Sequence, residues 1–568
     1  MKSRISFFNK TVFRKNLTRF APAWGLCTVF LTLAVFTCCS FNLEQAGSNL
    51  LDLGQSYCTY SFFFAPLCAQ LLFGDLFNSR MCNALHALPL RRETWFGTNV
   101  LSGFVFHLIP AVSATVLAGL LLILFDYQGN LAVVPLFLLC VLLQYLFFFG
   151  IAVFSVFCVG SRFGHTVVYL LLNFGSLIVQ WLVSSLYTPM FYGLKTNPDP
   201  FQLFSPVVKL SGSPFFTVET IQRYLSDQDW DYRFVDTKTI LPGEGFVYYF
   251  LAAAAGVLLL VGALWLYRRR KLEYAGDFLA IPGLGSVFSL IFTLTVGAFF
   301  FEISAGILLL LGLVVGWFTS RMMLERTVRV FKKKNFLRCG AVIGVFLLTM
   351  GLAALDPLGL ESWVPEEEET ESVSLFAGHY DYRTGDPFLV LEEEADVEAV
   401  IGIHRDCLDY YYENADELDR IALRGGVPLD KESIPLTLSY RLKNGRTVNR
   451  HYYVRGEENL QQLVLWLNAP EMVFGEALTE ETFLEQNLYV EWHKANSLEK
   501  KTVFGPENLQ ELYRAILADC ANGTMQQELE HYTSMDLERS YTLTFSSGLK
   551  LTVYTESTNT IQWIKNHR

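Results

Sequence analysis

The chain has 568 residues, of which 52% are hydrophobic and 15% aromatic, and its formal net charge is −11. Its apolar runs are about 20 residues long, enough to cross roughly 30 Å of hydrocarbon, which excludes a purely soluble protein. Residues 1–356 carry 26 Lys and Arg against 17 Asp and Glu, whereas residues 357–568 carry 18 against 38. We therefore expect a polytopic membrane part followed by an acidic domain in a different environment.

Residues 1–20 precede the first apolar run and mix aromatic and basic residues in the stretch FFNKTVFRKNLTRF. This pattern predicts an amphipathic helix that lies in the inner headgroup plane. A plain basic flank of the first span is an equally acceptable interpretation.

Nine apolar segments predict transmembrane helices. They lie at about 21–41, 57–77, 99–125, 131–158, 163–187, 245–267, 284–301, 304–320 and 338–356. The first is long for a signal-peptide core and lacks a small-x-small cleavage site, so we expect it to remain as an anchor.

The basic residues predict the orientation of these spans. Of the 26 Lys and Arg in residues 1–356, 21 lie before the first span or in the loops after spans two, four, six and eight. Cytoplasmic loops are the ones that carry such an excess, so the N-terminus is expected inside the cell. The long 188–244 segment and residues 357–568 are then expected outside.

A short polar stretch, NALHALPLRRETWFGTN, separates spans two and three. Met81, Leu85 and Leu88 share one face at helical spacing, and Pro89 ends the helix before span three. A short cytoplasmic amphipathic helix fits a groove on a partner protein. Alternatively, the same helix rests on the inner lipid headgroups.

Ionisable residues are sparse within the spans. His107, His165, Asp75, Asp126 and Glu302 are scattered along the sequence, which argues against an embedded enzyme or a proton-driven carrier. His107 has either a functional role or, among its apolar neighbours, a single interhelical hydrogen bond. No G-x-x-x-x-G-K-[ST] motif is present, so a P-loop for ATP is not expected on this chain. No catalytic residue, metal ligand or nucleic-acid site is predicted.

Four stretches resemble parts of a known family. LFNSRMCNALHALPLRRETWFGTNVLSG (residues 76–103) is similar to the loop between spans two and three of ABC-2-type ABC transporter permeases of Gram-positive bacteria, with the match on Leu88, Pro89, Arg92 and Phe96. YRRRKLEYAGD (267–277) and MLERTVRVFKKK (323–334) are similar to stretches of the same group. SYRLKNGRTVNRHYYV (439–454) resembles an appended domain of unknown function found on such permeases.

The resemblance implies a domain plan. It consists of an interfacial helix at 1–20 and a six-span permease core at 21–267 that includes the extracellular segment 188–244. Beyond this plan the sequence adds three spans at 268–356 and the extracellular domain 357–568. The resemblance also implies a multi-pass protein of the cell membrane that contacts membrane lipids and pairs with a second permease, either an identical chain or a sister chain. The three added spans and the outer domain depart from the minimal six-span members.

The resemblance further implies a coupling helix that binds a separate ABC ATPase subunit, which would hold ATP and Mg²⁺. The coupling residues expected from it are Ala84, Leu85, His86, Leu88, Pro89, Arg91, Arg92 and Glu93. Among these, Ala84, Leu85 and Leu88 are expected in a cleft of the ATPase. Arg91 and Arg92 are expected to contact its acidic rim or the inner headgroups.

The acidic domain has the pattern of an α+β fold. IPLTLSYRLKNGRTVNRHYYV alternates around Asn444-Gly445, which predicts a β-hairpin, and a helical stretch follows it. Strands precede a helix twice more, and PFLVLEEEADVEAVIGIHRDCLDYYY is a degenerate fourth copy, so we predict repeated strand–helix units with the helices on one sheet. Cys407 and Cys520 form either one disulfide or two buried thiols. Acidic runs at 366–369 and 392–394 are either sites for divalent cations or a cationic peptide, or a solvated linker and loop, which is the favoured interpretation.

The sequence therefore predicts an α-helical polytopic membrane protein with a C-terminal extracellular α+β domain. Its expected role is the permease subunit of an ABC transporter, with an unidentified substrate and export as the expected direction. A membrane-anchored sensor is the first alternative, and a membrane-embedded enzyme on lipid or polysaccharide is the second.

Overall fold

The computed structural model describes residues 8–40, 46–87, 89–125, 130–195, 204–218, 221–222, 234–235, 240–243, 245–270, 275–281, 283–304, 306–377, 389–423, 434–470, 483–484, 488–494, 497–504, 506–525, 541–545, 550–553 and 557–566. The chain divides into two compact units. Residues 1–185 and 198–347 form the membrane unit, and residues 186–197 and 348–568 form the C-terminal unit.

The membrane unit is mostly helical. Its main helices are α1 (Lys10–Arg19), α2 (Ala21–Ser40), α3 (Ala46–Phe73), α4 (Ser79–His86), α5 (Arg92–Leu124), α6 (Val133–Cys158), α7 (Arg162–Leu186), α9 (Pro206–Gly212), α10 (Phe246–Arg269), α11 (Leu284–Ile303), α12 (Leu309–Glu325) and α13 (Lys333–Ala354). The turn η1 (Gly74–Phe77) joins α3 to α4. Strands β2 (Phe216–Val218) and β5 (Ile240–Pro242) form a small ribbon before α10, and β3 (Ile221–Gln222) pairs with β4 (Phe234–Val235).

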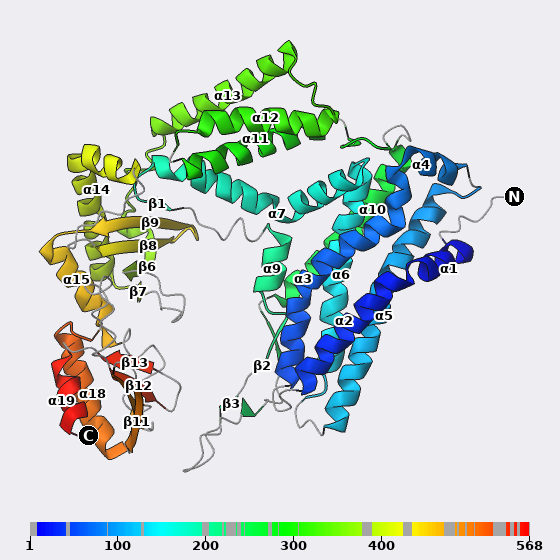
Figure 1. Cartoon of the computed structure of the whole chain (residues 1–568). Helices are drawn as coiled ribbons and strands as arrows, with labels where there is room; N and C mark the ends of the chain where they lie inside the picture. The colour runs from blue at the N-terminus through cyan, green and yellow to red at the C-terminus, as the bar shows by residue number, and fades with distance from the viewer. Residues whose placement is uncertain are drawn as a thin grey trace. The chain divides into compact units, whose positions relative to one another are not determined.

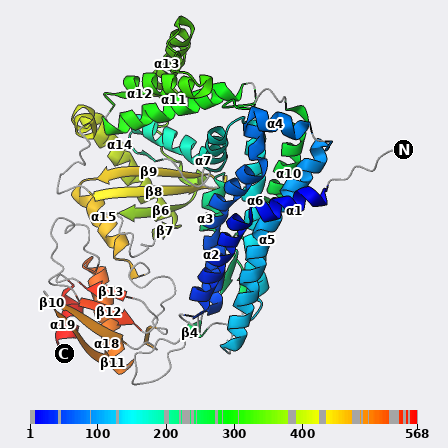
Figure 2. The ribbon, with the colours of Figure 1, turned by 45° about the vertical axis from the view of Figure 1, so that its right-hand side comes forward.

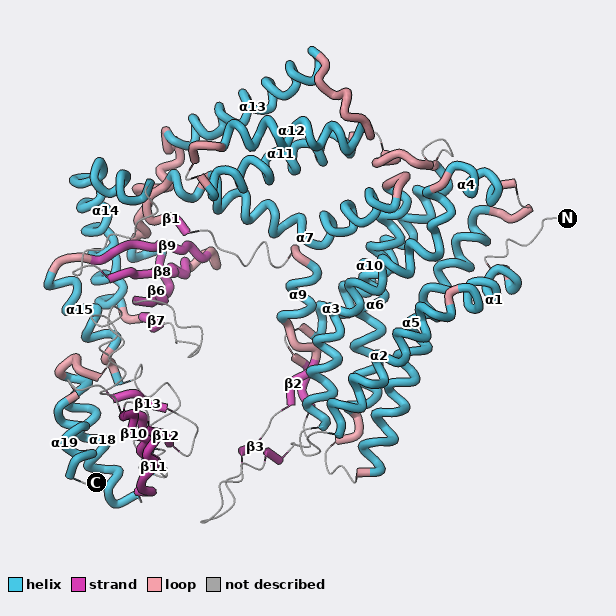
Figure 3. Tube along the Cα trace, in the orientation of Figure 1, coloured by secondary structure: helices cyan, strands magenta, loops and turns pink. Residues whose placement is uncertain are grey.

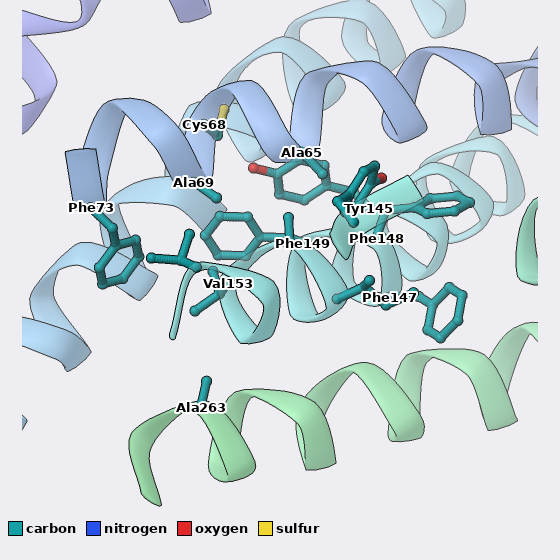
Figure 4. Close-up of a cluster of buried hydrophobic side chains, with 14 of the residues drawn as sticks. Ala65, Cys68, Ala69, Phe73, Tyr145, Phe147, Phe148, Phe149, Val153 and Ala263 are labelled. Carbon is teal, nitrogen blue, oxygen red and sulfur yellow. The ribbon is translucent and has the colours of Figure 1, made fainter. Parts of the chain in front are cut away.

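Helices α2, α3, α5, α6 and α10 run side by side, as Figure 1 shows. Aromatic side chains of α6 fill the centre of this bundle. Tyr145, Phe148 and Phe149 are buried on the side of α6 that faces α3, as the close-up in Figure 4 shows. Gly150 and Gly256 allow α6 and α10 to cross closely, because a Cβ on Gly150 would lie 2.4 Å from the carbonyl oxygen of Gly256. Small residues at such crossings are typical of membrane helix packing.

A helix lies at each of the nine predicted spans. Eight helices of the described residues are long and apolar enough to cross a membrane, so the chain is a helical multi-pass membrane protein by length and composition. The exception is α12, which begins at Leu309 rather than near residue 304 and has 17 residues. At about 1.5 Å per residue it measures about 26 Å, less than the roughly 30 Å of a hydrocarbon core.

The predicted N-terminal helix is present as α1, which packs against the first turns of α5. The Asn16 amide donates to Asn99 Oδ1 at 2.7 Å and to Ser102 Oγ at 3.1 Å. The backbone amide of Asn9 donates to Thr98 Oγ1 at 2.9 Å. These polar contacts fix α1 to the N-terminal end of α5.

The C-terminal unit contains two antiparallel sheets, and Figure 3 distinguishes their strands from the surrounding helices. The first sheet has the order β1-β9-β8-β6-β7 and the second the order β11-β10-β12-β13. The strands are β1 (Leu194–Lys195), β6 (Thr370–Ala377), β7 (Leu389–Leu391), β8 (Ile434–Leu442), β9 (Thr447–Val454), β10 (Leu488–Lys494), β11 (Ser497–Phe504), β12 (Tyr541–Phe545) and β13 (Lys550–Val553). The helices are α14 (Glu394–Leu423), α15 (Glu457–Leu467), α18 (Pro506–Ala521) and α19 (Thr558–Asn566).

Each sheet contains two strand–strand–helix repeats, which confirms the repeated pattern read from the sequence. The prediction of one sheet is wrong, because the repeats pair two by two into separate sheets. β6-β7-α14 and β8-β9-α15 form the first sheet, and β10-β11-α18 and β12-β13-α19 form the second. In both sheets the first strands of the two repeats are neighbours and the second strands lie outside them. The predicted hairpin is β8–β9, which lie side by side in Figure 2, and its turn contains Gly445 at φ 79°.

Helices cover one face of each sheet. Leu438 and Tyr440 of β8 and Tyr452 of β9 are buried against α14 and α15. Leu543 of β12 and Val553 of β13 are buried with α18 and α19. Alternate residues of each strand face these cores, as the alternating sequence predicts. Cys407 and Cys520 are buried thiols that form no disulfide, so the disulfide alternative is wrong.

The first sheet has a fifth strand that comes from the segment after α7. Leu194 pairs with Arg450 of β9, and the His451 amide donates to the Gly193 carbonyl at 2.8 Å. Next to it, Tyr192 stacks on Tyr411 with ring centroids 3.9 Å apart. The segment 186–197 is therefore an integral part of the C-terminal unit.

Candidate functional site: the α4 helix and its contacts

Helix α4 is short because Asn78 sets its start and Pro89 limits its end. The Asn78 side chain caps its start, accepting from the backbone amides of Arg80 at 3.0 Å and Met81 at 3.4 Å. An Asn in this position satisfies amides that have no partner inside the helix. Pro89 follows the end of the helix and cannot continue it. The sequence prediction of a short helix before span three is confirmed in these residues.

The two faces of α4 differ. Cys82 is buried, and Leu85 and His86 are half-buried, with Leu85 packed against the core of the membrane unit. The opposite face is exposed and consists of Arg80, Met81, Asn83, Ala84 and Ala87. Leu85 is thus engaged within the chain, whereas Ala84 is on the outward face. Leu88 lies outside the described residues, and Pro89 is exposed.

His86 links α4 to α10. Its Nδ1 lies 2.8 Å from the Cys82 carbonyl oxygen, and its Nε2 lies 3.2 Å from the Tyr267 hydroxyl. A carbonyl only accepts, so Nδ1 carries the proton in the neutral ring and Nε2 accepts from Tyr267. Sequence reasoning selected His86 but not Tyr267 as its partner.

Arg92 binds the C-terminal end of α10. Its Nη1 donates to the carbonyl oxygens of Tyr267 at 3.1 Å, Arg268 at 3.3 Å and Arg270 at 3.3 Å. The last carbonyls of a helix have no partner within it and lie at its negative end, so a guanidinium there is stabilising. The guanidinium also lies 5.6 Å from the centre of the Tyr267 ring.

We call the meeting point of α4, the start of α5 and the end of α10 the α4 junction. Two neighbouring contacts complete it. Arg270 donates to the carbonyls of Val156 on α6 at 3.1 Å and of Leu76 in η1 at 3.4 Å. Burial lowers the pKa of the Arg270 guanidinium, with partial compensation from nearby Cys82. Glu93 forms a more exposed ion pair with Arg268 at 3.1 Å, which contributes little to stability.

The structure therefore assembles two separated sequence motifs. The stretch that contains Pro89, Arg92 and Phe96 meets Tyr267 and Arg270 of the second stretch. Arg91 is exposed, whereas Arg92 is directed into this junction, so the adjacent arginines have different environments. Tyr267, Arg268 and Arg270 were missed as site residues, although the charge run after span six was their sequence signal.

The scattered ionisable residues of the spans have separate partners. His107 contacts the Tyr57 hydroxyl at 3.3 Å, which confirms an interhelical hydrogen bond. His165 contacts the Gln70 amide at 2.9 Å and the Ala152 carbonyl at 3.0 Å. Glu302 of α11 accepts a hydrogen bond from Ser185 of α7. Asp126 lies outside the described residues, and Asp75 is half-buried in η1.

Within the described ranges, no group of three or more His, Cys, Asp and Glu is placed to hold a metal ion. The Cys82 thiol lies 3.7 Å from His86 Nδ1, but that nitrogen carries the proton donated to the Cys82 carbonyl and therefore does not act as a base toward the thiol. The chemistry of the α4 junction is that of a mechanical connection, with an exposed face on one side and hydrogen bonds to α5, α6 and α10 on the other.

No protein-family model, curated protein or solved structure matches the chain.

Proposed function

We propose that this chain is the permease subunit of an ABC-2-type ABC transporter. In this proposal α4 is the coupling helix and seats in a cleft of a separate ATPase, which holds ATP and Mg²⁺. The permease pairs with itself or a sister chain, and the outward direction of transport is part of the same proposal. The C-terminal unit is then an extracellular accessory domain.

The observation that carries the proposal is the attachment of α4 to the core. A coupling element must present a face to the moving partner and be fixed to the helices that it moves. The exposed Met81 and Ala84 meet the first requirement. His86 and the adjoining Arg92 meet the second, through Tyr267 and the end of α10.

The β1–β9 pairing supports the proposed orientation. Because Leu194 pairs with Arg450, the segment after α7 and the C-terminal unit must lie on the same side of the membrane. Counted from a cytoplasmic N-terminus, α7 is the fifth crossing and leads outside. In this proposal an even number of crossings follows α7 before the C-terminal unit, which argues against a total of eight.

Two counts satisfy this requirement. If the short α12 crosses, the chain has nine crossings, as the sequence predicts. If α11 and α12 enter and leave on the cytoplasmic side as a hairpin, it has seven. Both counts put residues 357–568 outside the cell together with segment 186–197.

The test is whether the exposed face of α4 binds an ATPase. We expect the intact, tagged chain to co-purify from its native membrane with an ABC ATPase identified by mass spectrometry. Met81→Asp with Ala84→Asp should abolish this, because an apolar side chain such as Met81 in a cleft contributes roughly 1.5–3 kcal/mol. Arg91→Ala should weaken it only modestly, since a rim charge acts mainly on association rate.

Leu85 is unsuitable for this test because its substitution would also disturb the chain's own packing. The matched control is Val390→Asp with Leu465→Asp, two exposed apolar positions in the C-terminal unit. Loss of the ATPase with this control as well would indicate a general defect. Unchanged ATPase recovery with the α4 variant would contradict the proposal.

A membrane-anchored sensor is the second candidate function. It is favoured by the attachment of the C-terminal unit to the chain through both segment 186–197 and the end of α13, where the Tyr187 and Thr349 hydroxyls lie 2.9 Å apart. A kinase or response regulator, recovered in place of an ATPase in the same purification, would support the sensor.

A further inference from the structure

The connection between α12 and α13 is strongly basic. We call residues 321–338 the basic turn. It contains seven Lys and Arg and one acid, Glu325. Six of its cations are exposed, namely Arg326, Arg329, Lys332, Lys333, Lys334 and Arg338.

The basic turn has a fixed conformation. The Trp317 indole donates to the Asn335 carbonyl at 3.1 Å, and the Asn335 amide donates to the Val330 carbonyl at 2.8 Å. The Phe318 ring packs against Phe331 and Phe336, with centroids 4.9 and 4.8 Å apart. The exposed cations are therefore presented by an ordered backbone, which reduces the entropy lost when they bind a ligand.

The positive charge is not balanced within the basic turn. Glu325 pairs with Arg321 at 2.9 Å and is more distant, at 3.9 Å, from Lys332. The first turn of α13 has no acidic residue, although three lysines lie at or next to its start. Lysines at this end are opposed by the helix dipole, so an external anion would relieve their mutual repulsion.

Apolar side chains are exposed between these cations. Val328 is 74% exposed and Leu337 is 76% exposed, and Phe331 and Phe336 are also exposed. α13 is apolar enough to cross a membrane, so its first turn lies where hydrocarbon gives way to headgroups. Cations interleaved with aliphatic and aromatic side chains are typical of segments that bind anionic bilayer surfaces. An acidic protein surface would match the charge but would leave these apolar side chains in water.

We propose that the basic turn binds the phosphate headgroups of anionic phospholipids. The lysines and arginines contact the headgroups, and Val328, Phe331 and Leu337 enter the adjoining acyl region. The proposal depends on α13 crossing the membrane and not on the permease function. It assigns a ligand class to a segment that the transport proposal leaves without a role.

The test is native mass spectrometry of the full chain in detergent with equal amounts of phosphatidylglycerol and phosphatidylcholine. We expect bound phosphatidylglycerol to exceed phosphatidylcholine by about tenfold or more, because each basic residue near an anionic surface contributes about fivefold. Lys332→Gln with Lys333→Gln and Lys334→Gln should remove most of this preference. Lys332→Arg with Lys333→Arg and Lys334→Arg keeps the positive charge and should retain the preference for phosphatidylglycerol.

The matched control removes the same charge from exposed positions of the C-terminal unit, with Lys443→Gln, Arg446→Gln and Lys565→Gln, and should keep the preference. Inorganic phosphate at millimolar concentration should not displace the bound phosphatidylglycerol. Displacement by phosphate would indicate a free-phosphate site and overturn the lipid assignment. Equal binding of the two lipids by the wild-type chain, or an unchanged preference in the Gln variant, would also overturn it.

Discussion

The guanidinium of Arg92 donates a hydrogen bond to the backbone carbonyl of Tyr267, a residue 175 positions later in the chain. This contact joins the first turn of α5 to the last turn of α10. A single side chain thus joins the start of α5 to the end of α10, and His86 of α4 contacts the same Tyr267, so these contacts can be tested one residue at a time.

Arg92→Met should destabilise the membrane unit, whereas Arg91→Met should not. The first change leaves carbonyls at the end of α10 without their charged donor, at a cost of about 1.5–3 kcal/mol. Arg91 is exposed, so its replacement changes little. The thermal unfolding midpoint of the detergent-purified chain is the measurement, and equal midpoints for the two variants would show that the Arg92 contacts are dispensable.

The side of the membrane occupied by each unit can be measured with cysteine labelling. In an otherwise cysteine-free chain, Arg446→Cys should react with a membrane-impermeant maleimide in intact cells, and Lys333→Cys should react only after lysis. Both positions are exposed, so accessibility within the protein does not limit the reaction. The reverse pattern would refute the proposed orientation.

The number of crossings depends on α12. Ile307 is 85% exposed between α11 and α12. With nine crossings, Ile307→Cys should label in intact cells like Arg446→Cys. Labelling only after lysis would refute the nine-crossing prediction and favour seven, with α11 and α12 as a hairpin.

Gly193→Val should detach β1 from the first sheet. Gly193 has φ +72°, and a Cβ there would lie 1.9 Å from the Tyr452 ring. The His451 amide would lose its acceptor and should exchange with deuterium faster. Gly212→Val is the control, because a Cβ at Gly212 meets nothing within 4 Å. Unchanged exchange at His451 would mean that the β1 pairing does not hold in solution.

The C-terminal unit should lose stability as pH falls below about 6.5. Burial, together with the charges of Arg450 and Arg405, lowers the pKa of His404 to about 3. Its ring nitrogens lie 3.1 Å from the Tyr440 hydroxyl and 2.7 Å from the Tyr452 hydroxyl. Between about pH 6.5 and this lowered pKa the unfolded chain binds a proton that the folded chain does not. The free energy of unfolding therefore falls by about 1.4 kcal/mol per pH unit.

Pulse proteolysis in urea at pH 7 and pH 5, scored by cleavage within residues 434–454, measures this effect. His404→Gln removes the titrating group and should show a smaller loss between the two pH values. His451, whose pKa burial also lowers, supplies part of the remaining dependence. An identical loss in wild type and variant would exclude His404 as a cause.

The sequence by itself determined the helical membrane part, the approximate position of each span and the strand–helix repeats of the C-terminal unit. These features are local, because hydrophobic length predicts a span and the alternation around Asn444 and Gly445 predicts a hairpin. The short α4 was predictable for the same reason, since Pro89 cannot continue a helix. The late start of α12 was not predicted, because an apolar run alone does not locate the turn that precedes the helix.

Only the tertiary structure decided which residues meet. Leu85 was expected to face a partner, but packing turns it toward the core, because Cys82 and His86 share its face. Arg91 and Arg92 have the same chemistry, and only the position of the α10 terminus distinguishes them. The pairing of β1 with β9 joins residues about 255 positions apart. Such contacts depend on the three-dimensional path of the chain, which local hydrophobic patterns do not specify.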